Sequence, residues 1–350
     1  MTAQSSPGSR IAGQALVARE GGRFDLEQVL TAPFGPSTIA IRTTWSGVSI
    51  GTEFAVLSGK LDWGDFPIVT GYMGVGRVTD VGADVTGFDV GDRVYYRRNA
   101  ELLLEQSGQP LNCAAGVHAS VAVLDPTGDH GADIVPDGVS DDLASMFVVP
   151  AVGLKGTDMA GVHVGASVVV LGVGMVGLAV VAACAARGAR VTAVDLRAEP
   201  LEVARRLGAH TVLDATQVDV DAEVRRLTDG AGADFVFEST GHGSSVDLGI
   251  RLCRQLGCFV WQGNYGDGPV SFEFLAAHSR RLRMVFPCDD GYRPFRRAVL
   301  DSMAQGRLRW DETITDRLHA SEAPKFFERV LADGAGRTLG ATIRWSDEPA

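Results

Sequence analysis

Two kinds of residue are scarce in this sequence, aromatic residues and basic residues. Aromatic side chains make up 7% of the 350 residues, whereas 43 residues are glycine. This balance is typical of an Ala-, Val- and Gly-rich α/β enzyme rather than of an aromatic-rich lectin or a protein that stacks single-stranded bases. The 32 Lys and Arg residues are outnumbered by 43 Asp and Glu residues, which gives a net charge of −11. An acidic chain does not attract a nucleic-acid backbone, so we expect no nucleic-acid partner.

Cysteine is also scarce, and the sequence begins without a secretion signal. The five cysteines are odd in number and form no C-x-x-C pair, which disfavours a disulfide scaffold and favours a reducing compartment. The first residues, MTAQSSPGSRIAGQ, lack the basic start and the apolar core of a signal peptide. We therefore expect a cytoplasmic protein.

One segment, residues 166–186, is long and apolar enough to cross a membrane. Its residues are apolar or glycine except for Ser167. The glycines within it lower the helix propensity, and the motif described below divides the segment into a strand followed by a helix. We therefore expect no membrane partner.

The two halves of the chain differ in pattern. In the first half, four alternating runs separated by Gly, Pro and Asp predict strands in an antiparallel, barrel-like domain: TIAIRTTW, GVGRVTDVG, DRVYY and SVAVLD. From about residue 154, strands alternate with helices, which predicts a parallel sheet covered on both faces. The six predicted strands begin near residues 167, 190, 210, 233, 258 and 281.

Six strands in regular alternation with helices predict an α/β fold with a Rossmann-type, doubly wound parallel sheet. A helix around residues 295–305 and the strands near the C-terminus are expected to rejoin the first domain. The predicted domains are therefore residues 1–153 with 292–350, and residues 154–291.

A glycine-rich motif follows the first strand of the predicted sheet and begins a helix. It reads Gly172-Val-Gly174-Met175-Val176-Gly177. The first glycine permits a tight turn, the second lets the backbone approach a pyrophosphate, and the third lets the helix pack closely on the strand. Asp195 ends the next strand, 18 residues after Gly177, close to the spacing of the acid that binds the adenosine ribose. The combination predicts a dinucleotide site.

Asp195 also indicates which dinucleotide binds. A carboxylate at this position accepts hydrogen bonds from the ribose hydroxyls and repels a 2′-phosphate, so we expect NAD rather than NADP. Arg197 either partly offsets that repulsion, lies along the adenine, or is an exposed surface charge, and the sequence leaves these alternatives open.

Three islands of sequence resemble the medium-chain dehydrogenase/reductase superfamily. They are VSIGTE (48–53), GYMGVGRVTDVGADVTGFDVGDRV (71–94), and the core that runs from VVVLGVGMVG to VDLRAEPLEVARRLGA. The resemblance covers nearly the whole chain and implies a GroES-like catalytic domain beside the Rossmann domain. It also implies that the loops after the fourth and fifth strands line the adenosine ribose and the nicotinamide; these loops contain Thr240, Gly263, Asn264 and Tyr265.

The sequence departs from the zinc-dependent members of this superfamily. Where they carry zinc-binding Cys, His with a following Glu, and a third Cys or acid, this chain has Ile50, Tyr72 with Met73, and the stretch 150–153. None of these supplies a thiolate, imidazole or carboxylate. The four-cysteine lobe of the structural zinc is also missing, since only Cys113 lies in that region. We therefore predict a branch that binds no zinc.

Other side chains must then handle the hydroxyl proton and the developing charge. The resemblance places Thr52 in the proton relay. Glu53 is either a base or, more in keeping with its position, a residue that holds the loop. Tyr72 either donates to a substrate oxygen or packs in the core. Lys155 interrupts an apolar run and is either an acid, base or electrostatic clamp, or a lysine that extends to solvent.

The sequence as a whole predicts a zinc-independent, NAD-dependent dehydrogenase. Its expected substrate is a small secondary alcohol, and general resemblance suggests a sugar, cyclitol or polyol. Two alternatives remain: an NADPH-dependent reductase of quinones or enones, and a non-catalytic dinucleotide-binding scaffold. The resemblance also implies a homodimer or homotetramer.

Overall fold

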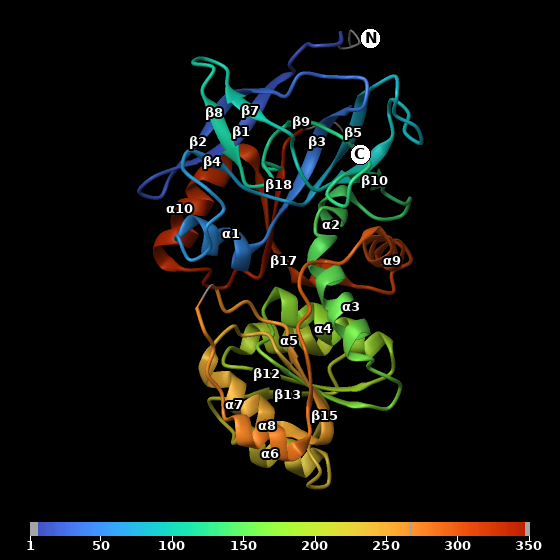
Figure 1. Cartoon of the computed structure of the whole chain (residues 1–350), viewed down its shortest axis with the longest axis vertical. Helices are drawn as coiled ribbons and strands as arrows, with labels where there is room; N and C mark the ends of the chain where they lie inside the picture. The colour runs from blue at the N-terminus through green and yellow to red at the C-terminus, as the bar shows by residue number, and fades with distance from the viewer. Residues whose placement is uncertain (1–5, 267, 347–350) are drawn as a thin grey trace. The chain divides into compact units, whose positions relative to one another are not determined.

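The computed structural model describes residues 6–266 and 268–346, which form two compact units (Figure 1). The first contains the described residues up to Phe147, Met303–Gln305 and the described residues from Ile314 onward. The second contains Val148–Ser302 and Gly306–Thr313. The second unit thus extends beyond the range 154–291 that the sequence predicts for the nucleotide-binding domain.

Two helices, together with Gly306–Thr313, make up most of the extension. Helix α3 (Val148–Ala160) is continuous and packs against α4 (Met175–Ala186) so closely that a Cβ at Gly153 would lie 2.5 Å from the Cβ of Ala179. Helix α9 (Arg293–Ala304) carries the fully buried Arg296, whose Nε lies 2.5 Å from a carboxylate oxygen of Asp290. The first contact joins α3 to α4 of the second unit, and the second joins α9 to the loop that precedes it.

The first unit is built from two mostly antiparallel sheets, as the alternating runs predict. Five strands close into a barrel, in the order β1 (Ala12–Arg19), β2 (Arg23–Thr31), β7 (Leu102–Leu104), β8 (Pro110–Cys113) and β4 (Ile68–Val69). The second sheet has the order β10 (Ala132–Ile134), β6 (Arg93–Tyr96), β5 (Gly74–Val81), β3 (Ile39–Val48), β18 (Gly340–Arg344) and β17 (Ile314–His319), and β9 (Val121–Leu124) also pairs with β3.

Helix α1 (Ile50–Leu57) carries two of the predicted catalytic residues, Thr52 and Glu53, and an aromatic contact fixes its place. The ring of Phe54 stacks on Phe327 of α10 (Ala323–Asp333) with centroids 5.2 Å apart. Phe327 is fully buried and also contacts Phe24 of β2. The helix is therefore held by apolar packing on one side while its polar residues remain for other contacts.

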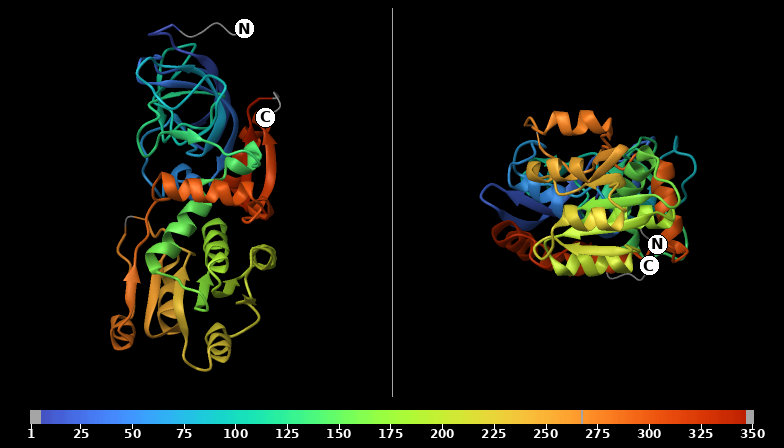
Figure 2. Two further views of the ribbon diagram at one scale, coloured as in Figure 1. Left: turned by 90° about the vertical axis from the view of Figure 1, so that its right-hand side faces the viewer. Right: turned by 90° about the horizontal axis from the view of Figure 1, so that it is seen from below.

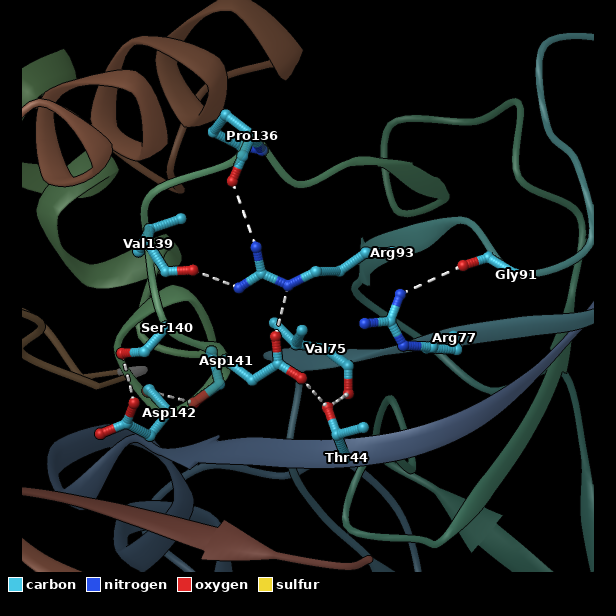
Figure 3. A network of polar contacts seen from close by, with 11 residues as sticks. Thr44, Val75, Arg77, Gly91, Arg93, Pro136, Val139, Ser140, Asp141 and Asp142 are labelled. Carbon is cyan, nitrogen blue, oxygen red and sulfur yellow. Dashed lines mark hydrogen bonds and ion pairs between the residues drawn. The ribbon is translucent and has the colours of Figure 1, made fainter. Parts of the chain in front are cut away.

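A buried ion pair fixes the chain where it approaches helix α2 (Asp141–Ala144) (Figure 3). The guanidinium of Arg93 donates to Asp141 at 2.5 Å and to the carbonyl of Pro136 at 3.2 Å. The hydroxyl of Thr44 on β3 donates to the other oxygen of Asp141 at 2.5 Å. Because Asp141 is almost fully buried, this network ties β3, β6 and the segment before α2 together.

The second unit is the doubly wound sheet that the sequence predicts. Its six parallel strands have the order β13 (Thr211–Asp214), β12 (Arg190–Asp195), β11 (Ser167–Leu171), β14 (Ala233–Glu238), β15 (Cys253–Trp261) and β16 (Arg283–Val285). Helices cover both faces (Figure 2), namely α3, α4, α5 (Ala198–Arg206), α6 (Val220–Leu227), α7 (Gly243–Leu252) and α8 (Phe274–Arg280). The strand order reverses between β11 and β14, which is where such sheets bind ligands.

The fifth strand begins earlier than the sequence predicts. The sequence predicts a strand from about residue 258, whereas α7 ends at Leu252 and β15 starts at Cys253. A bulge absorbs the difference, since the register with β14 shifts between Ala233 and Phe235 and Leu256 has a φ of +60°.

The apolar segment 166–186 is divided between β11 and α4 in the structure. Among the described residues, no helix is long and apolar enough to span a membrane.

Candidate active site

The glycine-rich turn has the geometry that its sequence predicts. Gly172 follows β11 with a φ of +79°, and a Cβ there would lie 2.6 Å from the side chain of Thr240. A Cβ at Gly177 would lie 1.9 Å from the carbonyl oxygen of Gly172. Gly174, by contrast, has no atom within 4 Å of its Cβ position. Two glycines are therefore required by packing, and the third leaves open space beside the backbone.

The first turn of α4 offers backbone donors next to that space. Gly174 is the residue before the helix, and its position supplies no side-chain cap. The amides at the start of a helix have no partner within it, and the helix dipole makes this end positive. Met175 and Val176, both half-buried, form the first turn. This end of α4 is therefore suited to the pyrophosphate of a dinucleotide.

Asp195 lies at the end of β12 with its carboxylate against the glycine turn. One oxygen accepts a hydrogen bond from the Val173 amide at 2.8 Å, and the other accepts from the amides of Leu196 and Arg197 at 2.8 and 3.0 Å. The oxygen that accepts from Val173 retains a lone pair that suits a ribose hydroxyl. The Arg197 side chain is 43% exposed and its Nε lies 3.8 Å from the Asp195 carboxylate, so the pair is weak.

Sequence reasoning gave no role to Glu238, which joins the loops after β14 and β15. Glu238 is fully buried. One oxygen accepts hydrogen bonds from the Thr240 amide at 2.9 Å and from the Thr240 hydroxyl. The other accepts from the Gly241 amide at 3.2 Å and from the Tyr265 phenol. Burial raises the pKa of Tyr265, and the Glu238 carboxylate raises it further. The phenol therefore stays protonated and acts as the hydrogen-bond donor.

The same two loops touch through their backbones. The Gly263 amide donates to the Glu238 carbonyl at 2.7 Å. A Cβ at Gly263 would lie 2.6 Å from the Gly241 amide, and a Cβ at Gly241 would lie 2.6 Å from the Asn264 carbonyl oxygen. The predicted cofactor residues Thr240, Gly263, Asn264 and Tyr265 therefore form one closely packed group at the carboxyl ends of adjacent strands.

Lys155 belongs to the second unit, on α3. Its ammonium donates a hydrogen bond to the Cys288 carbonyl, in the loop after β16. A Cβ at Gly291, in the same loop, would lie 3.1 Å from the Lys155 side chain. In this structure Lys155 therefore holds the chain between β16 and α9.

Glu53 is the centre of a buried network in the first unit. It is fully buried, and one of its oxygens accepts a hydrogen bond from the Ser49 amide at 2.8 Å. The other oxygen accepts from the Thr70 hydroxyl and from Nε2 of His118, both at 2.8 Å. A carboxylate only accepts hydrogen bonds, so Nε2 of His118 carries the proton in that contact. Both oxygens are therefore engaged in holding α1 to the barrel.

The network continues away from Glu53 through residues that sequence reasoning missed. Nδ1 of His118 lies 2.9 Å from the Ser46 hydroxyl, which also accepts a hydrogen bond from the Trp345 indole at 2.8 Å. His118 is 65 positions from Glu53 along the chain, so no local spacing links the two.

Tyr72 lies beside this network and forms a cluster with hydroxyl groups. Its side chain hydrogen-bonds with the Ser49 and Thr52 side chains. The guanidinium carbon of Arg97 lies 5.6 Å from the centre of the Tyr72 ring, and the Trp63 ring lies edge-on at 6.2 Å. Burial raises the pKa of the Tyr72 phenol, as does the Glu53 carboxylate, whereas the two hydroxyls and Arg97 oppose that rise. Thr52, Glu53 and Tyr72 are thus brought together, and Ser49 and Arg97 join them.

The donor set at this cluster does not fit zinc. Ile50 and the fully buried Met73 supply no hard ligand, and Tyr72 offers a phenol with a raised pKa. Within residues 6–266 and 268–346, no group of three or more His, Cys, Asp or Glu side chains could hold a metal ion. Burial also raises the pKa of the Cys113 thiol to about 11, which disfavours a metal-binding thiolate.

Two family models match the chain. An alcohol dehydrogenase GroES-like domain matches residues 35–132, and a zinc-binding dehydrogenase matches residues 175–304. A protein of Arthroderma otae named "Probable D-xylulose reductase A" is 30% identical over 297 residues, which cover 79% of this chain and 82% of that protein. The chain belongs to the medium-chain dehydrogenase/reductase superfamily.

Other members of the superfamily match over most of their length. An alcohol dehydrogenase of Cupriavidus necator is 27% identical over 344 residues, covering 86% of this chain and 90% of that protein. The solved structure of 2R,3R-butanediol dehydrogenase from Bacillus subtilis has a TM-score of 0.81 at 22% identity, covering 95% of this chain and 99% of that one. The chain is thus an oxidoreductase of the alcohol and polyol dehydrogenase type.

The zinc in the name of one family model does not bear on the cluster around Tyr72. That model matches residues 175–304, which contain α4, Asp195 and the loops after β14 and β15 but neither Ile50 nor Tyr72. Membership in the superfamily therefore does not by itself assign a zinc ion to this chain.

Proposed function

We propose that this superfamily member is an NAD-dependent, zinc-independent dehydrogenase that oxidises a secondary alcohol of a small polar molecule. The observation that carries the proposal is the Tyr72 cluster. The resemblance places the Tyr72 phenol where zinc-dependent members have a metal ligand, and the phenol hydrogen-bonds with the Ser49 and Thr52 hydroxyls. A sugar, cyclitol or polyol is the proposed substrate class, and the relatives named for D-xylulose and butanediol support it.

Each unit contributes one part of the proposed reaction. The chemistry that NAD⁺ would supply when bound is a hydride acceptor, its nicotinamide ring. The glycine turn and the start of α4 would hold the pyrophosphate, and Asp195 would accept a hydrogen bond from the adenosine ribose. Tyr72 and Thr52 take up the hydroxyl proton of the substrate as its C–H electron pair leaves. Lys155 is less suited to that task, because its ammonium already binds the Cys288 carbonyl.

Cofactor choice tests the second unit's part of the proposal. Titration of the purified protein with NADH and with NADPH, followed by nucleotide fluorescence, should give tighter binding of NADH. A preference for NADPH would contradict the role of Asp195 and would favour the quinone or enone reductase. Binding of either nucleotide without turnover of any alcohol, ketone or enone would favour the scaffold.

Metal content tests the first unit's part. Protein produced in zinc-supplemented medium should contain far less than one zinc per chain by mass spectrometry of the metal. Its oxidation of polyols, followed by NADH absorbance, should survive incubation with a chelator. One zinc per chain together with loss of activity on chelation would overturn zinc independence.

The oligomeric state belongs to the same proposal. We propose a homodimer or homotetramer, and light scattering coupled to size-exclusion chromatography measures it directly. A single peak at the mass of one chain, 36.9 kDa, would contradict this part.

A further inference from the structure

The charged groups around Tyr72 differ in the sign of their charge and in their contacts. Glu53 and Arg97 are the charged side chains whose electrostatic effect reaches the phenol. Both oxygens of Glu53 are engaged by three buried donors, so its contribution is fixed by the fold. Arg97 follows β6, is 8% exposed, and presents its guanidinium to the ring at 5.6 Å, within the range of a cation–π contact.

A cation near a phenol favours the ionised form of that phenol. Arginine suits this position because it stays charged when buried and its planar group lies against aromatic faces. Burial and Glu53 act in the opposite direction on Tyr72, so the loss of the nearby cation would raise the pKa of the phenol further. The position of Arg97 thus has a direct chemical consequence for Tyr72.

We propose that Tyr72 exchanges the substrate's hydroxyl proton and that Arg97 is the positioning residue that stabilises its phenolate. The inference rests on the proposed function. In alcohol oxidation, the C–H electron pair passes as hydride to the nicotinamide, and the hydroxyl proton passes to the phenolate oxygen of Tyr72. The phenol then releases that proton to water through the hydroxyl of Thr52 or Ser49. In ketone reduction both transfers reverse, and the Tyr72 phenol donates the proton.

The sign of the pH dependence follows from this assignment. Oxidation requires the phenolate, so kcat/KM for oxidation rises with pH until Tyr72 is ionised and is constant above that point. Removing the Arg97 charge moves this rise to higher pH.

The first measurement needs no substrate. Tyr72 is replaced by 3-fluorotyrosine, whose phenol ionises at lower pH, and its ionisation is followed by fluorine NMR in the cofactor-free protein. Arg97→Met should raise the pKa of this phenol by about one unit, a tenfold change in the ionisation constant. Arg97→Lys, which keeps the charge, should restore most of the shift. An unchanged titration in Arg97→Met would overturn the role of Arg97.

The second measurement uses activity. The rise of kcat/KM with pH should move upward in Arg97→Met and return in Arg97→Lys, while Tyr72→Phe should lose at least a hundredfold in kcat at all pH values. If Tyr72→Phe retains full kcat in an active dehydrogenase, the inference fails together with the proton role of Tyr72, whereas the proposed NAD-dependent alcohol oxidation stands. If the NMR shift is found but no alcohol is oxidised, the proposed function fails. Should Arg97→Met not fold, Arg97→Gln replaces it in both measurements.

Discussion

Glu53 in the first unit and Glu238 in the second are both fully buried carboxylates that hold several donors. The donors to Glu53 come from positions 4, 17 and 65 residues away, and they are Ser49, Thr70 and His118. The donors to Glu238 come from positions 2, 3 and 27 residues away, and they are Thr240, Gly241 and Tyr265. The two sites use the same chemistry over different distances along the chain.

The difference in sequence separation indicates which parts of the chain each carboxylate holds together. Glu53 joins helix α1 to the chain around β4 and β9 in the middle of the first unit, so its hydrogen bonds are part of the fold. Glu238 joins two loops at the carboxyl ends of β14 and β15, where a parallel sheet binds its ligand. Loss of Glu53 should therefore reduce stability most, and loss of Glu238 should reduce cofactor affinity most.

The largest expected effect is that of Glu53→Ala. This change leaves three buried donors without their acceptor, and we expect a loss of about 3–5 kcal/mol in the free energy of unfolding. Urea unfolding, with hydrogen exchange of peptides from the first unit, measures it. Glu20→Ala removes an exposed glutamate of the same unit and should change stability by less than about 0.5 kcal/mol. If Glu53→Ala lowers the free energy of unfolding as little as Glu20→Ala does, Glu53 does not stabilise the first unit as the comparison with Glu238 requires.

Glu238→Ala should act mainly on binding. Without the carboxylate, Thr240 and Tyr265 lose their common acceptor, and the two loops lose their fixed arrangement. We expect NADH to bind roughly 10- to 100-fold more weakly by calorimetry, about 1.4–2.8 kcal/mol. Tyr265→Phe removes one of the donors and should weaken binding by a smaller factor. Unchanged NADH affinity in Glu238→Ala would mean that both carboxylates serve only the fold.

The two sites also differ in how far the sequence predicts them. The glycine turn and Asp195 follow from spacing, because a tight turn, a helix start and a strand end lie close together along the chain. The loop positions Thr240 and Tyr265 follow from the family resemblance, together with the rule that ligands lie beyond the carboxyl ends of parallel strands. Glu238 is the last residue of β14, so the sequence predicts its position at that edge of the sheet. Its hydrogen bonds to Thr240, Gly241 and Tyr265 could not be predicted.

The cluster in the first unit could be predicted only in part. Thr52, Glu53 and Tyr72 were found by their positions in two islands of the family resemblance, and Ser49 lies in the first of these and could have been added. His118 and Arg97 carry no comparable signal. They reach their partners only when β6 has paired with β5 and β9 has paired with β3 in the second sheet. Contacts between residues so far apart along the chain produce no periodic pattern in the sequence.

Asp195→Asn tests whether the second site discriminates between cofactors by charge. The amide keeps the shape of the side chain but repels a 2′-phosphate less, so the ratio of NADPH to NADH dissociation constants should fall about tenfold. Fluorescence titration with both nucleotides measures the ratio. Arg197→Ala should leave it unchanged if Arg197 is a surface charge. A large shift in Arg197→Ala instead would assign the discrimination to the arginine.

Lys155→Met is expected to have the smallest effect on catalysis. It tests whether proton exchange belongs to Tyr72 of the first unit or to Lys155 of the second. The ammonium of Lys155 holds the Cys288 carbonyl, a contact within the second unit, while the proposed proton exchange belongs to Tyr72 in the first. Methionine keeps much of the packing against Gly291 but loses the hydrogen bond. We therefore expect KM for NAD⁺ to rise about threefold, a change of about 0.7 kcal/mol, with kcat and the pH profile preserved. If a limb of the pH profile disappears with Lys155, the proton exchange belongs to the second unit, because a residue that only holds a loop cannot remove a titration.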